Sequence, residues 1–150
     1  MIRSALVAAL STVFLAACSG PADAPSVEVV DAYIVAPSGG RDIAGGGALI
    51  TANAAGYTLT GVETTAAETV ELHTMAMEDG VMRMRKVESF DIAAGTTRAL
   101  ESGGDHLMFF GVDDALAPGD SVELLMDFEG EDGSTNVLSI RADVRALGED

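Results

Sequence analysis

Soft metal ligands are concentrated in two short stretches of this chain. The first, ELHTMAMEDGVMRMRKV at residues 71–87, contains four of the seven methionines and one of the two histidines. The second, HLM at residues 106–108, contains the other histidine and a fifth methionine. Thioether sulfur is soft and uncharged and selects Cu(I) over hard ions, while neutral imidazole adds affinity for copper. Methionines at alternating strand positions also commonly fill gaps in a core, so the spacing has to decide between a metal site and packing.

The first stretch is predicted to be a β-hairpin. The dipeptide Asp79-Gly80 favours a two-residue turn, from which the strands pair back. The predicted cross-strand pairs are Glu78 with Val81, Met77 with Met82, Met75 with Met84, and His73 with Lys86. Because side chains alternate between the faces of a strand, His73 and all four methionines project to one side. His73 and Met84 become diagonal neighbours, with Cβ atoms about 7–8 Å apart, so two long side chains can close on a shared ion.

The second stretch supplies the remaining ligands. His106 and Met108 are two residues apart in a strand-like run, so they share a face, and Leu107 turns towards the core. Gly103-Gly104 just before them allows a tight backbone approach or a bulge, a common feature beside a functional site. The predicted metal ligands are His73, Met84, His106 and Met108, with Met75 as a spare sulfur or a neighbour of the ligands. Two nitrogens and two sulfurs without thiolate or carboxylate make a poor zinc site and an exchangeable Cu(I) site.

Composition narrows the class of protein. The chain has 150 residues, enough for one domain, with 24 acidic and 8 basic residues and a net charge of -16. With no basic face to displace phosphate counterions, we expect no nucleic-acid partner. The same charge argues against electrostatic attachment to anionic membranes.

The N-terminus is predicted to be an export signal that ends in a lipidated cysteine. Arg3, the uncharged and mostly apolar run over 5–17 and the small residues before Cys18 are typical of a secretory signal peptide, here residues 1–17. The apolar run is too short to cross a bilayer. The ending Leu15-Ala16-Ala17-Cys18 is similar to a bacterial lipobox, after which Cys18 would carry lipid. The alternative is an ordinary signal with an incidental cysteine.

These segments predict a lipoprotein on the periplasmic side of a bacterial envelope. Residues 18–26 are the lipidated Cys18 and a flexible tether, and Ser19 after the cysteine favours the outer membrane. Because no second cysteine exists, the domain at 27–147 has to be stable without a disulfide.

The domain itself is predicted to be all-β. From residue 27 onward, runs rich in β-branched and aromatic residues alternate with turn-forming clusters. The expected strands are 27–35, 47–54, 57–65, 69–77, 81–87, 107–112, 121–129 and 134–144. No window sustains a helical period, so we expect one antiparallel sandwich or barrel. Gly45-Gly46-Gly47 is interpreted as a flexible turn or bulge.

The spacing of the four ligands resembles the signature of the PCu(A)C family of periplasmic copper chaperones. Ten residues separate His73 from Met84, twenty-one separate Met84 from His106, and one separates His106 from Met108. The likeness covers about residues 27–145. It includes Asp31-Ala32-Tyr33, Glu71-Leu72-His73, Gly80-Val81-Met82-Arg83-Met84, Ile92-Ala93-Ala94-Gly95, Gly103-Gly104-Asp105-His106-Leu107-Met108 and Gly119-Asp120. Ala93, Ser102 and Ala48 depart from the family pattern, away from the proposed ligands.

The resemblance implies a cupredoxin-like antiparallel β-sandwich or Greek-key barrel that binds one Cu(I) ion through His73, Met84, His106 and Met108. It also implies a chaperone that exchanges copper with a donor or acceptor protein of the envelope, towards the binuclear copper site of cytochrome c oxidase. A general periplasmic copper scavenger and a metal-free structural or interaction lipoprotein are the alternatives. We expect a monomer and no enzyme, because there is no thiolate for a blue-copper centre and four side-chain ligands leave little room for substrate.

Overall fold

The computed structural model describes residues 26–149. The signal peptide predicted for residues 1–17 and the lipidation predicted at Cys18 lie outside these described residues. Within the described part of the chain, no helix is long and apolar enough to cross a membrane.

The described chain is built from ten β-strands. They are β1 Val27–Val35, β2 Ile43–Ala52, β3 Tyr57–Glu63, β4 Thr69–Glu78, β5 Val81–Val87, β6 Phe90–Ile92, β7 Thr96–Leu100, β8 His106–Phe110, β9 Ser121–Gly130 and β10 Thr135–Arg145. Each of the eight predicted strands is present. The sequence prediction missed β6 and β7, whose three and five residues are too few for a clear alternating pattern.

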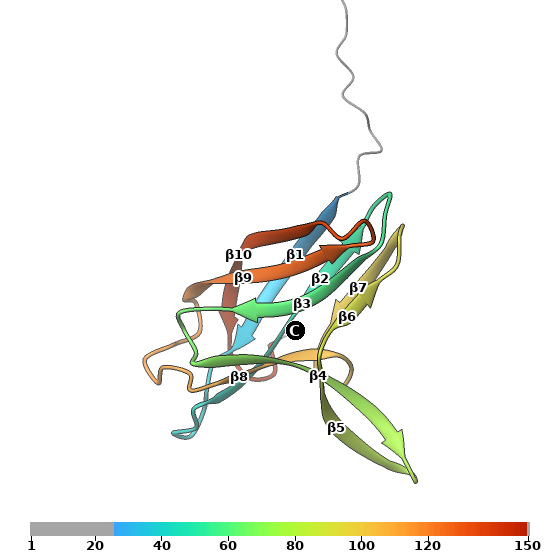
Figure 1. The fold of residues 1–150 in the computed structure, drawn as a ribbon. Helices are drawn as coiled ribbons and strands as arrows, with labels where there is room; N and C mark the ends of the chain where they lie inside the picture. The colour runs from blue at the N-terminus through green and yellow to red at the C-terminus, as the bar shows by residue number, and fades with distance from the viewer. Residues whose placement is uncertain (1–25, 150) are drawn as a thin grey trace, which may run out of the picture.

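The strands form one hydrogen-bonded path that folds over on itself. Its order is β5-β4-β8-β2-β1-β10-β9-β3-β6, with β7 also paired to β2. Figure 1 shows β3 and β9 passing in front of β1 and β2, with the β4–β5 hairpin extending away from the body of the fold. Neighbouring strands are antiparallel, apart from the parallel pair of β1 with β10. The all-β prediction is therefore confirmed, with one parallel pair added.

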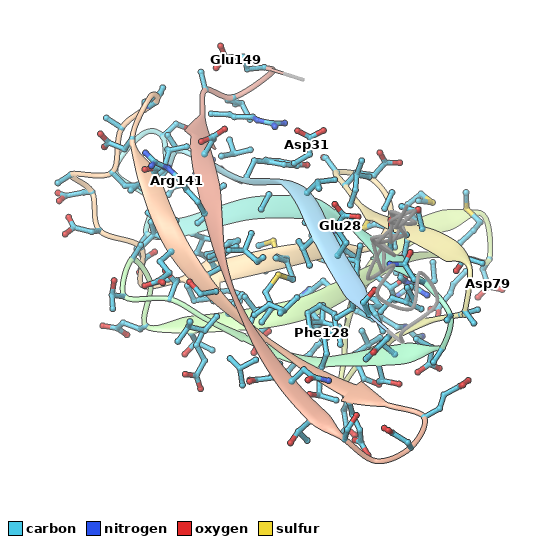
Figure 2. All side chains as sticks on the ribbon, turned by 90° about the horizontal axis from the view of Figure 1, so that it is seen from above. Glu28, Asp31, Asp79, Phe128, Arg141 and Glu149 are labelled. Atoms are coloured by element: carbon cyan, nitrogen blue, oxygen red, sulfur yellow. The ribbon has the colours of Figure 1, made fainter. Side chains whose placement is uncertain are left out.

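The core lies between the two layers and follows the alternation of side chains between the two faces of a strand. Leu124, Met126 and Phe128 of β9 are fully buried, while the residues between them are more exposed. Figure 2 shows Phe128 inside the fold and the charged Asp79 and Glu149 at its edges. From the facing strands, Leu107 and other large apolar side chains complete this core. The domain thus has a single hydrophobic core that needs no disulfide.

The prediction of a turn or bulge at Gly45-Gly46-Gly47 is wrong. These glycines lie inside β2, where Gly46 pairs with both Leu107 of β8 and Ile34 of β1. A Cβ atom at Gly46 would lie 2.4 Å from the backbone oxygen of Tyr33, so close strand approach explains the glycine. The irregularity lies in the partner strand, where the register of β1 shifts between Val30 and Tyr33.

Candidate metal centre

The β4–β5 hairpin has the predicted register. Met75 pairs with Met84, Met77 pairs with Met82, and His73 pairs with Lys86. At the turn, Asp79 and Gly80 have φ angles of 51° and 79°. Two consecutive positive φ angles are typical of the type I′ turn, whose twist matches that of the flanking strands. One face of the hairpin therefore carries His73 and all four methionines of the first stretch.

Strand β8 brings the second stretch against the first. It pairs antiparallel with β4, so that His106 lies directly opposite His73 and Met108 lies opposite Glu71. The centroids of the two imidazole rings are 5.8 Å apart. Leu107, between the two predicted ligands of β8, is fully buried in the core, as its position in the sequence predicted. Two histidines that are 33 positions apart in the chain thus meet across β4 and β8.

The ring of His106 is held by its own loop. His106 is 6% exposed, and its Nδ1 is 2.9 Å from the backbone oxygen of Gly104. A carbonyl oxygen only accepts hydrogen bonds, so Nδ1 carries the proton and donates it. The lone pair is then on Nε2, which makes Nε2 the nitrogen able to bind a metal ion.

The ring of His73 is held by Glu71, and this arrangement leaves Nδ1 without a partner. Nε2 of His73 donates to Oε2 of Glu71 at 2.8 Å, while Nζ of Lys86 donates to Oε1 of the same carboxylate at 2.7 Å. These hydrogen bonds, Lys86 first and His73 second, lower the pKa of Glu71, which favours the ionised carboxylate. Among the described residues, Nδ1 of His73 is the one buried side-chain nitrogen or oxygen atom that has no hydrogen-bond partner.

An unpartnered buried nitrogen is unfavourable and calls for an explanation. Leaving such a group desolvated costs about 1–3 kcal/mol. Since Nε2 of His73 carries the proton, Nδ1 has a free lone pair, on a ring that neighbours the ring of His106. A carboxylate that fixes the tautomer and orientation of an imidazole is the usual companion of a metal-binding histidine. A bound cation would satisfy the orphaned atom.

A cavity of about 390 Å³ lies beside His106. Its lining includes His106 and the three methionines Met75, Met84 and Met108. Met84 is 49% exposed, so the cavity is bordered by a side chain that solvent reaches. The structure thus brings His106, Met84 and Met108 around one space, with His73 next to His106 and outside the lining. Met75 lines the same space, opposite Met84, so its predicted role as spare sulfur or neighbour stays open.

The donor atoms at this cavity favour a soft ion. Within residues 26–149, no group of three or more histidine, cysteine, aspartate or glutamate side chains is placed to hold a metal ion. What the site offers instead is imidazole nitrogen and thioether sulfur, the ligands that suit Cu(I). The identity of the four ligands stays a prediction.

Sequence reasoning missed the polar side chains that hold the ligand-bearing strands together. Asp105, next to His106, accepts a hydrogen bond from Thr74 Oγ1 at 2.7 Å and pairs with Nη2 of Arg98 at 2.5 Å. Arg98 also donates to the backbone oxygen of Asp91 at 2.7 Å. This network ties β7 and the start of β8 to β4 at the level of the histidines. Its sequence signal is weak, because a single Arg in a short strand is usually a solvated side chain.

The fold and site define a class of β-sandwich proteins with a histidine and methionine cavity at the base of a projecting hairpin. The chain belongs to the LpqE-like family, since the family model described as "Putative lipoprotein LpqE-like" matches residues 27–139. A relative from Leifsonia xyli subsp. xyli, "Putative lipoprotein Lxx21020", is 30% identical over 118 residues, which are 78% of this chain and 69% of the relative.

Solved structures with the same fold include copper-binding domains. The copper-bound PCuAC domain from PmoF2 has a TM-score of 0.64 at 18% identity, covering 80% of this chain and 92% of that one. The solution structure of CuI-DR1885 from Deinococcus radiodurans has a TM-score of 0.62 at 24% identity, covering 87% of this chain and 85% of that one. These similarities confirm the expected cupredoxin-like β fold. The family model that matches the chain is that of the LpqE-like family rather than the PCu(A)C family that the ligand spacing resembles.

Proposed function

We propose that this protein is a copper chaperone of the bacterial cell envelope that binds one Cu(I) ion and passes it on by ligand exchange. The ligands would be Nδ1 of His73, Nε2 of His106 and the sulfurs of Met84 and Met108. The observation that carries the proposal is the buried, unpartnered Nδ1 of His73, on a ring that neighbours His106, while His106 itself lines the methionine-containing cavity. A cation there would satisfy the nitrogen that the fold leaves without a hydrogen bond.

The chemistry of this ligand set suits a carrier rather than an enzyme. Thioethers are neutral and do not need to lose a proton, so they can leave an ion as readily as they bind it. The two solved structures of this fold described above, the PCuAC domain from PmoF2 and DR1885, hold copper, which supports the proposal. The acceptor we propose is the binuclear copper site of cytochrome c oxidase. A general periplasmic scavenger would use the same site without a dedicated acceptor.

We further propose that Cys18 carries lipid and holds the domain at the membrane, with the outer membrane favoured by Ser19. The lipoprotein description of the family and of the Leifsonia relative supports the lipid anchor. The short segment up to residue 26 would then tether the domain.

Anaerobic Cu(I) competition against a chromophoric chelator tests the binding proposal. The wild-type domain should take one equivalent of Cu(I), and His106→Ala and Met84→Leu should each compete less well. Met126→Leu is the matched control, because Met126 is a fully buried core methionine and leucine has nearly the same volume. A wild-type domain that takes no Cu(I) would contradict the proposal and favour a metal-free interaction module. Equal competition by the wild type and both site variants would contradict the assigned ligands.

Delivery is tested separately, by mixing the Cu(I)-loaded domain with the copper-free binuclear domain of the oxidase. Transfer faster than spontaneous release into buffer supports a chaperone. Transfer at the rate of spontaneous release supports a scavenger.

A further inference from the structure

Two exposed methionines lie further out on the hairpin than the proposed copper site. Met77 is 65% exposed and Met82 is 47% exposed, and the two are direct cross-strand partners. They flank the turn at Asp79, which Figure 2 shows at the edge of the molecule. Large apolar side chains in such a position contribute little to the stability of the core. A function outside packing would explain why methionine occupies both positions.

The exposed pair continues the row of sulfurs that leads to the site. Met77 and Met82 form one rung, and Met75 and Met84 form the next rung on the same face. Successive rungs are two residues apart, about 6.6–6.8 Å along the strand, and cross-strand Cβ atoms are about 4.5–5.5 Å apart. Thioether side chains thus follow one another from the solvent-exposed tip to the cavity beside His106, with no rung missing.

The charges of the hairpin do not interrupt this row. Glu78 faces the opposite side of the hairpin, where it pairs with Arg83 and Arg85. Glu71, which is on the methionine face, lies beyond His73 and is engaged by that ring and by Lys86. Met77 and Met82 therefore present neutral soft donors, without a carboxylate on their face between them and the cavity.

We propose that Met77 and Met82 form a transient Cu(I) station at the hairpin tip, through which copper enters and leaves the main site. This inference rests on the proposed function and deepens it. Copper stays monovalent throughout: at each step a bond to one thioether forms as a bond to a neighbouring ligand breaks, and no electron or proton moves. Two thioethers bind Cu(I) more weakly than two thioethers and two imidazoles do, so at equilibrium the ion occupies the main site. The probe that isolates the station is Ag(I), a soft monovalent ion without redox chemistry.

The first experiment uses the full mature domain with ¹³C-methyl-labelled methionine and follows an Ag(I) titration by NMR. The methyl signals of Met84 and Met108 should move during the first equivalent. Those of Met77 and Met82 should move together when Ag(I) is in excess. The buried Met126 serves as an internal reference, and its signal should stay in place.

The second experiment measures how fast the Cu(I)-loaded domain gives up copper to a chelator. Met77→Leu/Met82→Leu keeps the apolar surface and removes both sulfurs, so release should slow several-fold while the equilibrium affinity is unchanged. Val81→Ala is the matched control, since Val81 is an exposed apolar residue at the same tip on the opposite face, and it should release copper at the wild-type rate. The Met126 methyl signal reports whether each variant is folded.

The outcomes separate the two proposals. If Met84 and Met108 respond to Ag(I) and Met77 and Met82 do not, or if the double variant releases copper at the wild-type rate, the station is wrong and the main site stands. If none of the four responds, the copper site itself is wrong. If Val81→Ala slows release as much as the double variant, apolar contact at the tip explains the effect, and the thioether station is overturned.

Discussion

The link between Glu71 and His73 makes a quantitative prediction about copper affinity. Glu71 accepts from Nε2 of His73 at 2.8 Å and from Nζ of Lys86 at 2.7 Å, so it fixes both the tautomer and the orientation of the ring. Partners of this kind typically contribute 10–100-fold to metal affinity. Glu71→Ala removes the acceptor altogether, so we expect a loss of Cu(I) affinity towards the upper end, about 100-fold.

Two further substitutions should cause smaller losses of Cu(I) affinity. Glu71→Gln keeps an oxygen that can accept from His73 and loses the charge, so its loss should lie near the lower end, about tenfold. Lys86→Ala leaves the carboxylate on His73 and removes its second contact, so it is the matched control with the smallest loss. The predicted order of losses is Glu71→Ala, then Glu71→Gln, then Lys86→Ala.

The assay is anaerobic Cu(I) competition, combined with ¹⁵N NMR of the imidazole nitrogens. In the wild type, His73 should carry its proton on Nε2 and His106 should carry its proton on Nδ1, as their hydrogen bonds dictate. In Glu71→Ala, the His73 signals should show a mixture of tautomers, while those of His106 stay unchanged. Wild-type affinity in Glu71→Ala, with the His73 tautomer also unchanged, would refute the reasoning.

Three other predictions follow from the same structure. Cu(I) affinity should weaken as the pH falls from about 8 to about 5, because protons compete with the ion for the imidazoles. Glu71 has a lowered pKa and stays ionised over this range, so a Cu(I) affinity that does not change with pH would contradict histidine ligation. Asp105→Ala removes the hydrogen-bond partner of Thr74 and Arg98, so it should lower the free energy of unfolding, measured by urea denaturation, by about 1–3 kcal/mol. An unchanged free energy of unfolding would show that these hydrogen bonds do not stabilise the fold. Gly46→Ala should destabilise the fold by about 1–3 kcal/mol in the same assay, because its Cβ would clash with the backbone oxygen of Tyr33. An unchanged free energy of unfolding would show that β1 can shift to accommodate the methyl group.

Much of the hairpin could be predicted from the sequence because its geometry is local. A two-residue Asp-Gly turn fixes the register, and the register fixes which face each side chain occupies. The pairing of Met75 with Met84 and of Met77 with Met82 therefore followed without knowledge of the rest of the fold. The burial of Leu107 followed from the same period of two.

Features that depend on tertiary contacts were out of reach. Gly45-Gly46-Gly47 has the composition of a loop, and only the close approach of β1 and β8 makes it a strand. The parallel pairing of β1 with β10 joins the two ends of the domain, for which no local pattern exists. The direct opposition of His73 and His106 likewise needs the β4–β8 pairing, although the shared spacing of the ligands suggested that they meet.

The role of Glu71 could be predicted from the sequence only in part. It lies two residues from His73, on the same strand face, which was a usable signal. The sequence does not predict that the carboxylate accepts a hydrogen bond from Nε2 and leaves Nδ1 without a partner. Choices between two atoms of one ring depend on side-chain rotamers, which the spacing of residues does not encode.

X-ray absorption at the copper edge, on the domain loaded anaerobically with one equivalent of Cu(I), tests the central claim most directly. Scattering from two nitrogen and two sulfur neighbours is the expected result, with one nitrogen lost in His106→Ala and one sulfur lost in Met84→Leu. A spectrum that contains only nitrogen and oxygen neighbours, or one that neither substitution alters, would contradict the account.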